Sequence, residues 1–228
     1  MNLTDAIYLR HSVRAYTDKP IEPEKVAVLE EEISKCNAES GIRLKLVIED
    51  SSVFKSFLAR YGKFRNVHNS IIVSMPSKLE NGKELCGYYG ERIVLLAQTL
   101  GLNTCWVGLT FSKKSAKKYL LPDDSLVAVI ALGYGESQGV PRKSKSYNDV
   151  CNVPNPTEWL KRSVEAALLA PTALNKQNFR ITLSETGEPV LTAGKGMYTK
   201  VDLGIVKCHF DLASGITADS PSESEYLI

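Results

Sequence analysis

The chain has 228 residues, of which 43% are hydrophobic and 24% charged, with a formal net charge of +2. This balance is typical of a soluble globular protein with one large or two small domains, and the small charge argues against nucleic acid or an anionic membrane as a partner. No apolar run approaches the ~20 residues that cross a bilayer and no targeting segment is recognisable, so we expect a cytoplasmic protein.

Two helices are predicted near the amino terminus. The first spans residues 3–9 with Asn2 or Thr4 as its cap, and residues 20–23 connect it to the second. Apolar side chains recur in the second helix at spacings of three and four, which predicts one buried face: Val26, Leu29, Ile33 and Cys36.

A strand, a third helix and another strand are expected next. Residues 44–48 alternate between apolar and other side chains, which is typical of a half-buried strand. Ser51 or Ser52 is expected to cap a helix that runs to Arg60. The run 71–75, ended by Pro76, predicts the second strand.

The middle of the chain predicts a long helix, a buried strand and a connection. The helix covers residues 84–100 and ends at Gly101. Residues 126–132 are continuously apolar up to Gly133, as in a strand that is covered on both faces. Residues 135–156 are rich in Gly, Pro, Ser and Lys and predict a long surface connection.

The last part of the chain coarsely repeats the first. We expect a helix over residues 159–170, a strand over 179–183 and a helix over 201–214. Two glycine pairs fall at matching places, 114 residues apart: Gly90 with Gly204, and Gly101 with Gly215. This pattern suggests a duplicated unit, although the identities are few.

Cysteine and histidine spacing indicates neither a disulfide framework nor a metal site. The five cysteines are odd in number, widely spaced and contain no Cys-x-x-Cys pair, so reduced thiols are expected. The three histidines share no metal-ligand spacing. We interpret His209, on an apolar helix, as a core histidine, and Cys105 and Trp106 mainly as packing residues.

One dense polar cluster lies near the amino terminus. Arg10, His11, Ser12 and Arg14 follow the first helix within five residues. Arginine meets phosphate oxygens with paired, charge-assisted hydrogen bonds, and a serine hydroxyl adds a neutral donor. The cluster therefore suggests a phosphate site, although a solvated basic face or a partner of the helix dipole is the alternative reading.

A second cluster, residues 170–177, lies between a helix and a strand. Asn175 and Gln177 are two residues apart, so in an extended chain their amides point to one side. Such amides offer both donors and acceptors to the edge of a flat heterocycle. A polar turn whose amides cap backbone groups explains the same residues equally well.

Taken together, these clusters resemble the FMN-dependent nitroreductase family. Residues 10–16 resemble its R-x-S-x-R-x-F/Y signature and residues 170–179 its A-P-S-x-x-N-x-Q-P-W motif. Residues 101–108 are similar to its G-x-x-T-x-W-I-G segment, and residues 127–134 with Arg142 to its strand, Gly-Tyr and basic stretch. The subfamily named putative TM nitroreductases is the most similar.

The resemblance implies a fold and a flavin site. The fold would be α+β, a three-layer α/β/α arrangement with a mixed, mostly antiparallel sheet. Arg10, Ser12, Arg14 and Arg142 would hold the FMN phosphate and ribityl chain, and His11 would contribute nearby. The remaining residues would line the isoalloxazine ring: Val107, Gly108, Leu109, Pro171, Thr172, Ala173, Asn175 and Gln177.

One departure from the family bears on assembly. The motif that ordinarily follows the first long helix is replaced here by residues 36–41, and its intact version appears late in the chain. Family members build the flavin site at a dimer interface. We therefore expect a single domain over residues 1–228 with pseudo-repeats at about 1–135 and 155–228, forming an internal pseudo-dimer with one FMN. A further homodimer is left open.

The implied activity is that of an oxidoreductase. NADH or NADPH would deliver hydride to flavin N5, and a nitroaromatic, quinone or similar small molecule would take it up in a ping-pong cycle. No side chain need act as acid or base in the first half-reaction, so no catalytic residue is assigned, and Lys176 is a candidate charge beside the ring. The alternative is an FMN- or nucleotide-binding module without turnover.

Overall fold

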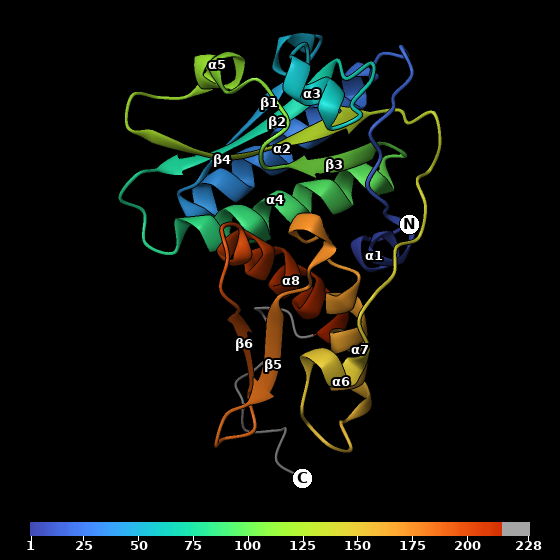
Figure 1. The fold of residues 1–228 in the computed structure, drawn as a ribbon, viewed down its shortest axis with the longest axis vertical. Coiled ribbons are helices and arrows are strands. Elements are labelled where there is room, and N and C mark those ends of the chain that lie inside the picture. The colour runs from blue at the N-terminus through green and yellow to red at the C-terminus, as the bar shows by residue number, and fades with distance from the viewer. Residues whose placement is uncertain (216–228) are drawn as a thin grey trace.

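A four-stranded antiparallel sheet of order β1-β2-β4-β3 forms the centre of the upper part of the molecule in Figure 1. The computed structural model describes residues 1–215. The strands are β1 (Arg43–Val47), β2 (Asn69–Pro76), β3 (Asn103–Val107) and β4 (Asp124–Gly133). The predicted strands are confirmed, and β4 is buried from Ala128 onward. The sequence did not predict β3.

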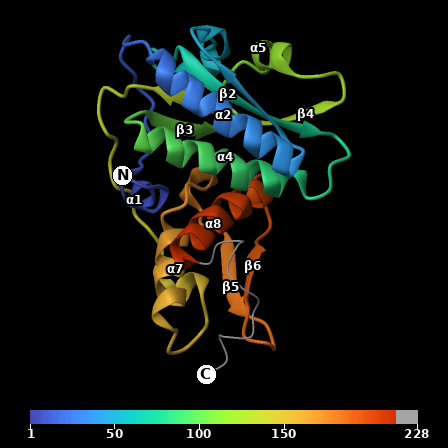
Figure 2. The same ribbon diagram turned by 180° about the vertical axis from the view of Figure 1, so that it is seen from behind.

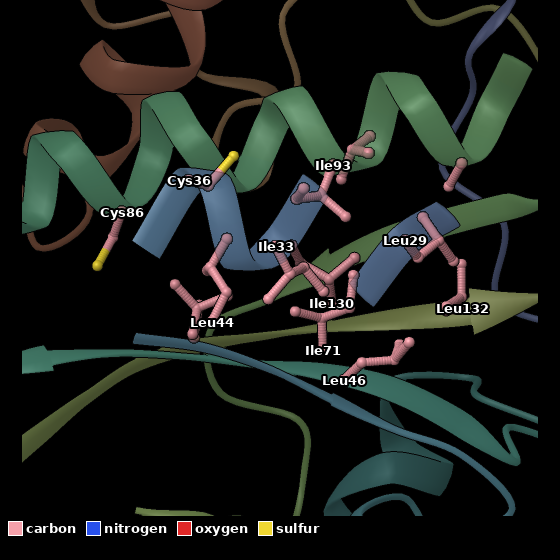
Figure 3. Packing of buried hydrophobic residues seen from close by; sticks show 14 of the residues in the cluster. Leu29, Ile33, Cys36, Leu44, Leu46, Ile71, Cys86, Ile93, Ile130 and Leu132 are labelled. Carbon is pink, nitrogen blue, oxygen red and sulfur yellow. The ribbon is translucent and has the colours of Figure 1, made fainter. Parts of the chain in front are cut away.

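Two long helices cover one face of this sheet, as Figures 1 and 2 show: α2 (Pro23–Ser40) and α4 (Gly82–Thr99). In the close view of Figure 3, Leu29 and Ile33 of α2 and Ile93 of α4 extend toward Ile71 and Ile130 of the sheet. These side chains are at most 6% exposed, and Cys36 is fully buried, which confirms the predicted apolar face of the second helix; Val26 at its start is partly buried.

Short elements cover the other face: η1 (Ser51–Val53), α3 (Phe57–Tyr61), α5 (Lys113–Ala116) and η2 (Lys117–Tyr119). The single helix expected from Ser51 or Ser52 to Arg60 is wrong, because the chain leaves helical geometry at Phe54. That ring is buried against Phe64, with centroids 5.0 Å apart, and packing outweighs local helix propensity there. The cap of η1 is Asp50 rather than a serine.

Helix α4 is covered on its other side by α1 (Leu3–Leu9) and α8 (Thr199–Ser214), as the arrangement in Figure 2 shows. Asn2 caps α1 in a capping box, as predicted. Helices α4 and α8 cross at Gly87 and Gly204. A Cβ atom on Gly204 would lie 1.9 Å from the carbonyl oxygen of Glu84, so only glycine permits this approach.

The remaining elements pack beside α8 in the lower part of Figure 1: α6 (Tyr147–Val150), α7 (Glu158–Leu168), η3 (Ala173–Asn175), β5 (Phe179–Leu183) and β6 (Pro189–Ala193). The predicted helices and the strand at β5 are confirmed. Strand β6, which pairs with β5, was not expected, because none of its residues is fully buried and it begins at a proline.

The predicted duplication stays a prediction. Gly101 and Gly215 follow α4 and α8 with φ of 77° and 74°, so this pair has matching geometry. Gly90 and Gly204 differ, because Gly90 faces the Trp106 ring whereas Gly204 faces the backbone of α4. Within residues 1–215, no helix combines the length and apolar character needed to cross a membrane.

Candidate functional site

A cavity of about 900 Å³ lies between the sheet and the part of the chain that contains α7 and α8. Its walls come mainly from residues 7–14, 105–110, 140–144, 168–178 and 195–205. This volume is typical of small-molecule sites. The lining includes nearly all of the predicted site residues: Arg10, His11, Ser12, Arg14, Val107, Gly108, Leu109, Arg142, Pro171, Thr172, Ala173 and Asn175.

Four basic side chains line the cavity, and the part that they line is called the basic end: Arg10, His11, Arg14 and Arg142. A backbone hydrogen bond from Val13 to Thr104 of β3, 3.0 Å long, holds this amino-terminal segment against the sheet. Burial and the two neighbouring guanidinium groups of Arg10 and Arg142 lower the pKa of His11. The imidazole is therefore neutral at neutral pH.

Arg142 enters the basic end from the long connection. Its Nη2 atom donates to the carbonyl oxygens of Ala170 (2.5 Å) and Leu168 (3.4 Å), which close the end of α7. Burial, with a contribution from nearby Arg10, lowers the pKa of Arg142 to about 10, so the side chain stays cationic at neutral pH. The long connection after β4 thus places one cationic side chain, that of Arg142, in the cavity.

Arg10 is the most buried of these groups, with 4% of its surface exposed. Its Nε atom lies 3.7 Å from Oε1 of Glu91 and has no hydrogen-bond partner in the described part of the chain. A buried donor without a partner costs free energy unless a ligand or water satisfies it. An anionic group at the basic end would supply that partner, so the residues here fit a phosphate.

Glu91 stands behind Arg10 in a buried polar cluster that joins β3, α4 and α8. Its carboxylate accepts a hydrogen bond from Nε1 of Trp106 at 2.7 Å and lies 2.9 Å from Nε2 of His209. Nδ1 of His209 faces the carbonyl oxygen of Ala166 at 3.0 Å. Both ring nitrogens of His209 thus lie within hydrogen-bond distance of an oxygen atom, and the cluster ties the imidazole to α4 and α7.

The segment after α7 forms the wall opposite β3. Leu174 and Asn175 have left-handed backbones with φ of 53°, which is uncommon outside glycine and typical of tight functional turns. Hydrogen bonds hold the segment in this shape. The Ala173 amide donates to Oδ1 of Asp202 at 3.0 Å, and the Asn175 side chain donates to the Lys143 carbonyl at 2.7 Å.

Gln177 is the predicted site residue that the structure places elsewhere, since it is not among the described residues that line the cavity. Its amide is buried and bonds to Ser144 and Leu168, while its oxygen accepts from the Lys145 amide. The expected shared direction of Asn175 and Gln177 required an extended chain. The turn of η3 and the left-handed φ of both residues redirect them.

The end of β3 forms a further wall. Gly108, expected beside the flavin ring, lines the cavity, and a Cβ atom there would lie 2.6 Å from the ring of Tyr198. The Tyr198 hydroxyl donates to the Gly108 carbonyl at 2.7 Å. The glycine is required by Tyr198 itself. Trp106 packs on Gly90 as a core residue, and it also lines the cavity.

Sequence reasoning missed several residues of the site. Asp202, Tyr198 and Lys195 line the cavity, and Glu91 supports it from behind. Two of them carry a recognisable signal, because Glu91 is followed by the apolar run 93–97 and Asp202 lies between Val201 and Leu203, so both acids fall at the edge of buried helix faces, where a charge needs a partner or a function. Lys176, considered beside the ring, does line the cavity.

Residues 2–214 match the model of the family described as "Putative TM nitroreductase". The chain belongs to this family. It has the nitroreductase fold, as solved structures also indicate. A nitroreductase structure from Thermotoga maritima, itself described as putative, has a TM-score of 0.66 at 24% identity, covering 93% of this chain and 83% of that one.

Two shorter relatives cover about two thirds of the chain. A protein from Desulfovibrio desulfuricans, described as a putative nitroreductase in complex with FMN, has a TM-score of 0.53 at 24% identity, over 68% of this chain and 99% of that one. A protein from Bacteroides thetaiotaomicron, described as a putative NADH dehydrogenase/NAD(P)H nitroreductase, has a TM-score of 0.51 at 23% identity. The match covers 66% of this chain and 96% of that one. No curated protein shows a significant match.

Proposed function

We propose that this nitroreductase-family chain binds FMN in the cavity and is an oxidoreductase that passes hydride from NADH or NADPH to a nitroaromatic, quinone or similar acceptor. One observation carries the proposal: three guanidinium groups, of Arg10, Arg14 and Arg142, line a cavity large enough for a cofactor. The FMN complex of the relative from Desulfovibrio desulfuricans supports it.

The residues present fit this cofactor at both of its ends. Arg10, Arg14 and Arg142, with the Ser12 hydroxyl, would hold the phosphate through charge-assisted hydrogen bonds. The turn that begins at Pro171 and the end of β3 would enclose the ring. Five cationic side chains line the cavity against one carboxylate, that of Asp202, and this excess suits an anionic cofactor: Arg10, Arg14, Arg142, Lys176 and Lys195.

When bound, the flavin would supply the hydride chemistry at its N5 atom, and an alternation of donor and acceptor in one space gives the ping-pong cycle. The chain's own residues bind and orient. Pro171, Thr172 and Ala173 limit access from one side, and Val107 to Leu109 from the other. Because residues of both proposed pseudo-repeats line this one cavity, we propose one FMN per chain, where the two pseudo-repeats meet.

Flavin binding and reduction test the proposal directly. The purified protein, freed of any flavin, is titrated with FMN while flavin fluorescence is followed, and the loaded protein is then mixed with NADH or NADPH without oxygen. We expect saturable quenching and bleaching of the flavin absorbance, followed by return of the colour with benzoquinone or a nitroaromatic. Absence of FMN binding would overturn the proposal, and a bound flavin that no nicotinamide reduces would favour a binding module without turnover.

A further inference from the structure

Asp202 lines the cavity without a role in the function proposed so far. It lies in the first turn of α8, is 8% exposed, and uses Oδ1 to accept the Ala173 amide at 3.0 Å. Its second oxygen, Oδ2, has no hydrogen bond to any residue between 1 and 215. A carboxyl group that is nine-tenths buried and half bonded has one oxygen available to a ligand in the cavity.

Asp202 is also the sole carboxyl group among the described residues that line this space. The charged or basic groups that share the cavity come from other elements: Arg10, His11, Arg14, Arg142, Lys176 and Lys195. The remaining titratable groups are the phenols of Tyr8, Tyr61 and Tyr198 and the thiol of Cys105. Burial raises the pKa of both Tyr198 and Cys105, so neither releases a proton near neutral pH.

Burial also raises the pKa of Asp202, but for this carboxyl group the result is a value close to neutral pH. It raises the pKa of this carboxyl group to about 6, against the effect of the Ala173 hydrogen bond, which lowers it. An acid with a pKa near the working pH holds a proton for an appreciable fraction of the time and can release it readily. Burial and the neighbouring guanidinium groups of Arg10 and Arg142 lower the pKa of His11, so this imidazole is a poor source of a proton at neutral pH.

We propose that Asp202 is the proton donor of this site, which holds a proton at Oδ2 and passes it to an acceptor molecule as that molecule takes up hydride. This inference rests on the proposed function. The Ala173 amide holds the carboxyl group against the turn that forms one wall of the cavity. Oδ1 therefore accepts the structural hydrogen bond, and Oδ2 carries the transferable proton.

Reduction of a quinone acceptor to the hydroquinone requires two electrons and two protons. Hydride, derived from NADH or NADPH through the flavin, brings two electrons and one proton to the quinone, and the nicotinamide is the group oxidised. The second quinone oxygen forms an O–H bond with the proton of Asp202, while the O–H bond at Oδ2 breaks and its electron pair remains on the carboxylate. Water then returns a proton to Asp202, and the product is the hydroquinone.

A comparison of two acceptors, one that takes up protons and one that does not, separates proton donation by Asp202 from its structural role. Benzoquinone needs a proton on its own atoms, whereas ferricyanide takes up one electron at a time and no proton. The variant Asp202→Asn keeps an oxygen that can accept the Ala173 amide but carries no transferable proton. Asp202→Glu restores a carboxyl group and serves as the rescue variant.

The experiment follows reoxidation of the reduced, FMN-loaded proteins by stopped flow, after photoreduction so that no nicotinamide is needed. We expect Asp202→Asn to slow benzoquinone reduction by about 100-fold while ferricyanide reduction stays within about twofold of wild type. The wild-type quinone rate should fall as pH rises through about 6, and Asp202→Asn should remove that fall. Asp202→Glu should recover part of the quinone rate.

Two measurements do not depend on turnover. Flavin fluorescence titration should give Asp202→Asn the FMN affinity of wild type within about twofold, because Oδ1 keeps the turn in place. Infrared difference spectra of the wild-type protein between pH 5 and pH 8, about one unit or more either side of the group's pKa, should contain a protonated carboxyl band that Asp202→Asn lacks.

The outcomes are distinct. Equal slowing of quinone and ferricyanide, no slowing of either, or absence of the carboxyl band would overturn the role of Asp202 while leaving the flavin assignment intact. Failure of the wild-type protein to bind FMN would instead remove the proposed function and this inference with it. If Asp202→Asn fails to fold, the infrared titration of wild type and the rate of Asp202→Glu still decide the matter.

Discussion

Arg10, Arg14 and Arg142 all line the cavity, but their side chains are held by different contacts. Arg142 is bonded to carbonyl oxygens at the end of α7, and Arg10 is buried beside Glu91. Arg14 is exposed, with its guanidinium 6.0 Å from the centre of the Phe64 ring. Among the three, Arg14 is therefore the one whose removal least disturbs the folded chain.

Arg14→Ala should weaken FMN binding by roughly 10- to 100-fold, because a charge-assisted contact with the phosphate is lost. Fluorescence titration measures the affinity. Arg180→Ala is the matched control, since Arg180 is an exposed arginine of β5 outside the cavity and should leave the affinity unchanged. Equal affinities for wild type and Arg14→Ala would count against a phosphate at the basic end.

Glu91→Gln should destabilise the protein by about 3 kcal/mol, because the neutral amide leaves the buried charge of Arg10 without its partner. Urea denaturation measures the change. The control is Glu136→Gln, which removes an exposed ion pair with Arg65 at 2.8 Å and should cost less than about 1 kcal/mol. Similar losses of unfolding free energy in the two variants would show that the buried cluster around Glu91 stabilises the protein no more than an exposed ion pair does.

Asp202 predicts a pH dependence of stability. Its pKa is raised by burial from an ordinary value of 3.8 to about 6 in the folded protein, so folding favours the protonated form. The stabilisation is complete below the unfolded pKa and is lost as pH rises through about 6.

The variant Asp202→Asn has no carboxyl group at this position, so its folding stability should not fall in this way as pH rises. Between pH 4 and pH 7.5, about two units below and one and a half above the folded pKa, wild type should lose on the order of 1–3 kcal/mol relative to the variant. Urea unfolding of both proteins without flavin at the two pH values measures it. A stability difference that does not change with pH would be inconsistent with a raised pKa.

At the scale of elements, α4 has the central position. The sheet and α2 cover one side of it, and α1 and α8 cover the other (Figure 2). Gly87 and Gly204 allow α4 and α8 to approach at backbone distance. Since α8 carries Asp202 and Tyr198 precedes it, this crossing sets the position of one cavity wall relative to the sheet.

Gly204→Ala should therefore cost about 3 kcal/mol or prevent folding, because its Cβ atom meets backbone atoms of Glu84 and Tyr88 that cannot move aside. Thermal or urea unfolding measures the loss. Gly101→Ala is the control: it has a φ of 77° and open space around it, so only the backbone penalty of about 1–2 kcal/mol applies. If Gly101→Ala were the more destabilising of the two, close packing at the crossing would not be limiting.

The prediction of elements from sequence succeeded where local signals agree with the tertiary environment. The apolar spacing in α2 and the glycine that ends α4 are such signals, since periodicity and caps act within a few residues. The helix expected up to Arg60 failed because Phe54 turns into a cluster with Phe64. Strand β6 was missed because it begins at a proline and none of its residues is fully buried.

At the scale of the whole molecule, a single chain supplies every wall of the cavity that the structure describes. Arg10 and Asp202 lie 192 positions apart in sequence yet line the same space. We propose that these residues complete the site, so that cofactor binding needs no second subunit. This arrangement supports the proposed pseudo-dimer, in which α4 and α8 pack against each other.

We therefore expect the chain to bind one FMN as a monomer of about 25 kDa. Light scattering coupled to gel filtration, with flavin absorbance recorded across the peak, measures mass and stoichiometry together. A homodimer with one flavin per chain would be compatible with a self-sufficient site. One flavin for every two chains would contradict it.

The amino-acid sequence by itself determined the main helices, the buried strand β4 and the two polar clusters, including Arg10 to Arg14 and the turn after Pro171. These depend on residues close together in the chain, whose periodicity, caps and turn chemistry act locally. Only the tertiary structure decided that Gln177 points into the protein and that Asp202 and Tyr198 form walls of the cavity. Their roles depend on the crossing of α4 and α8, which brings distant segments together by packing, and packing leaves no short-range pattern in the sequence.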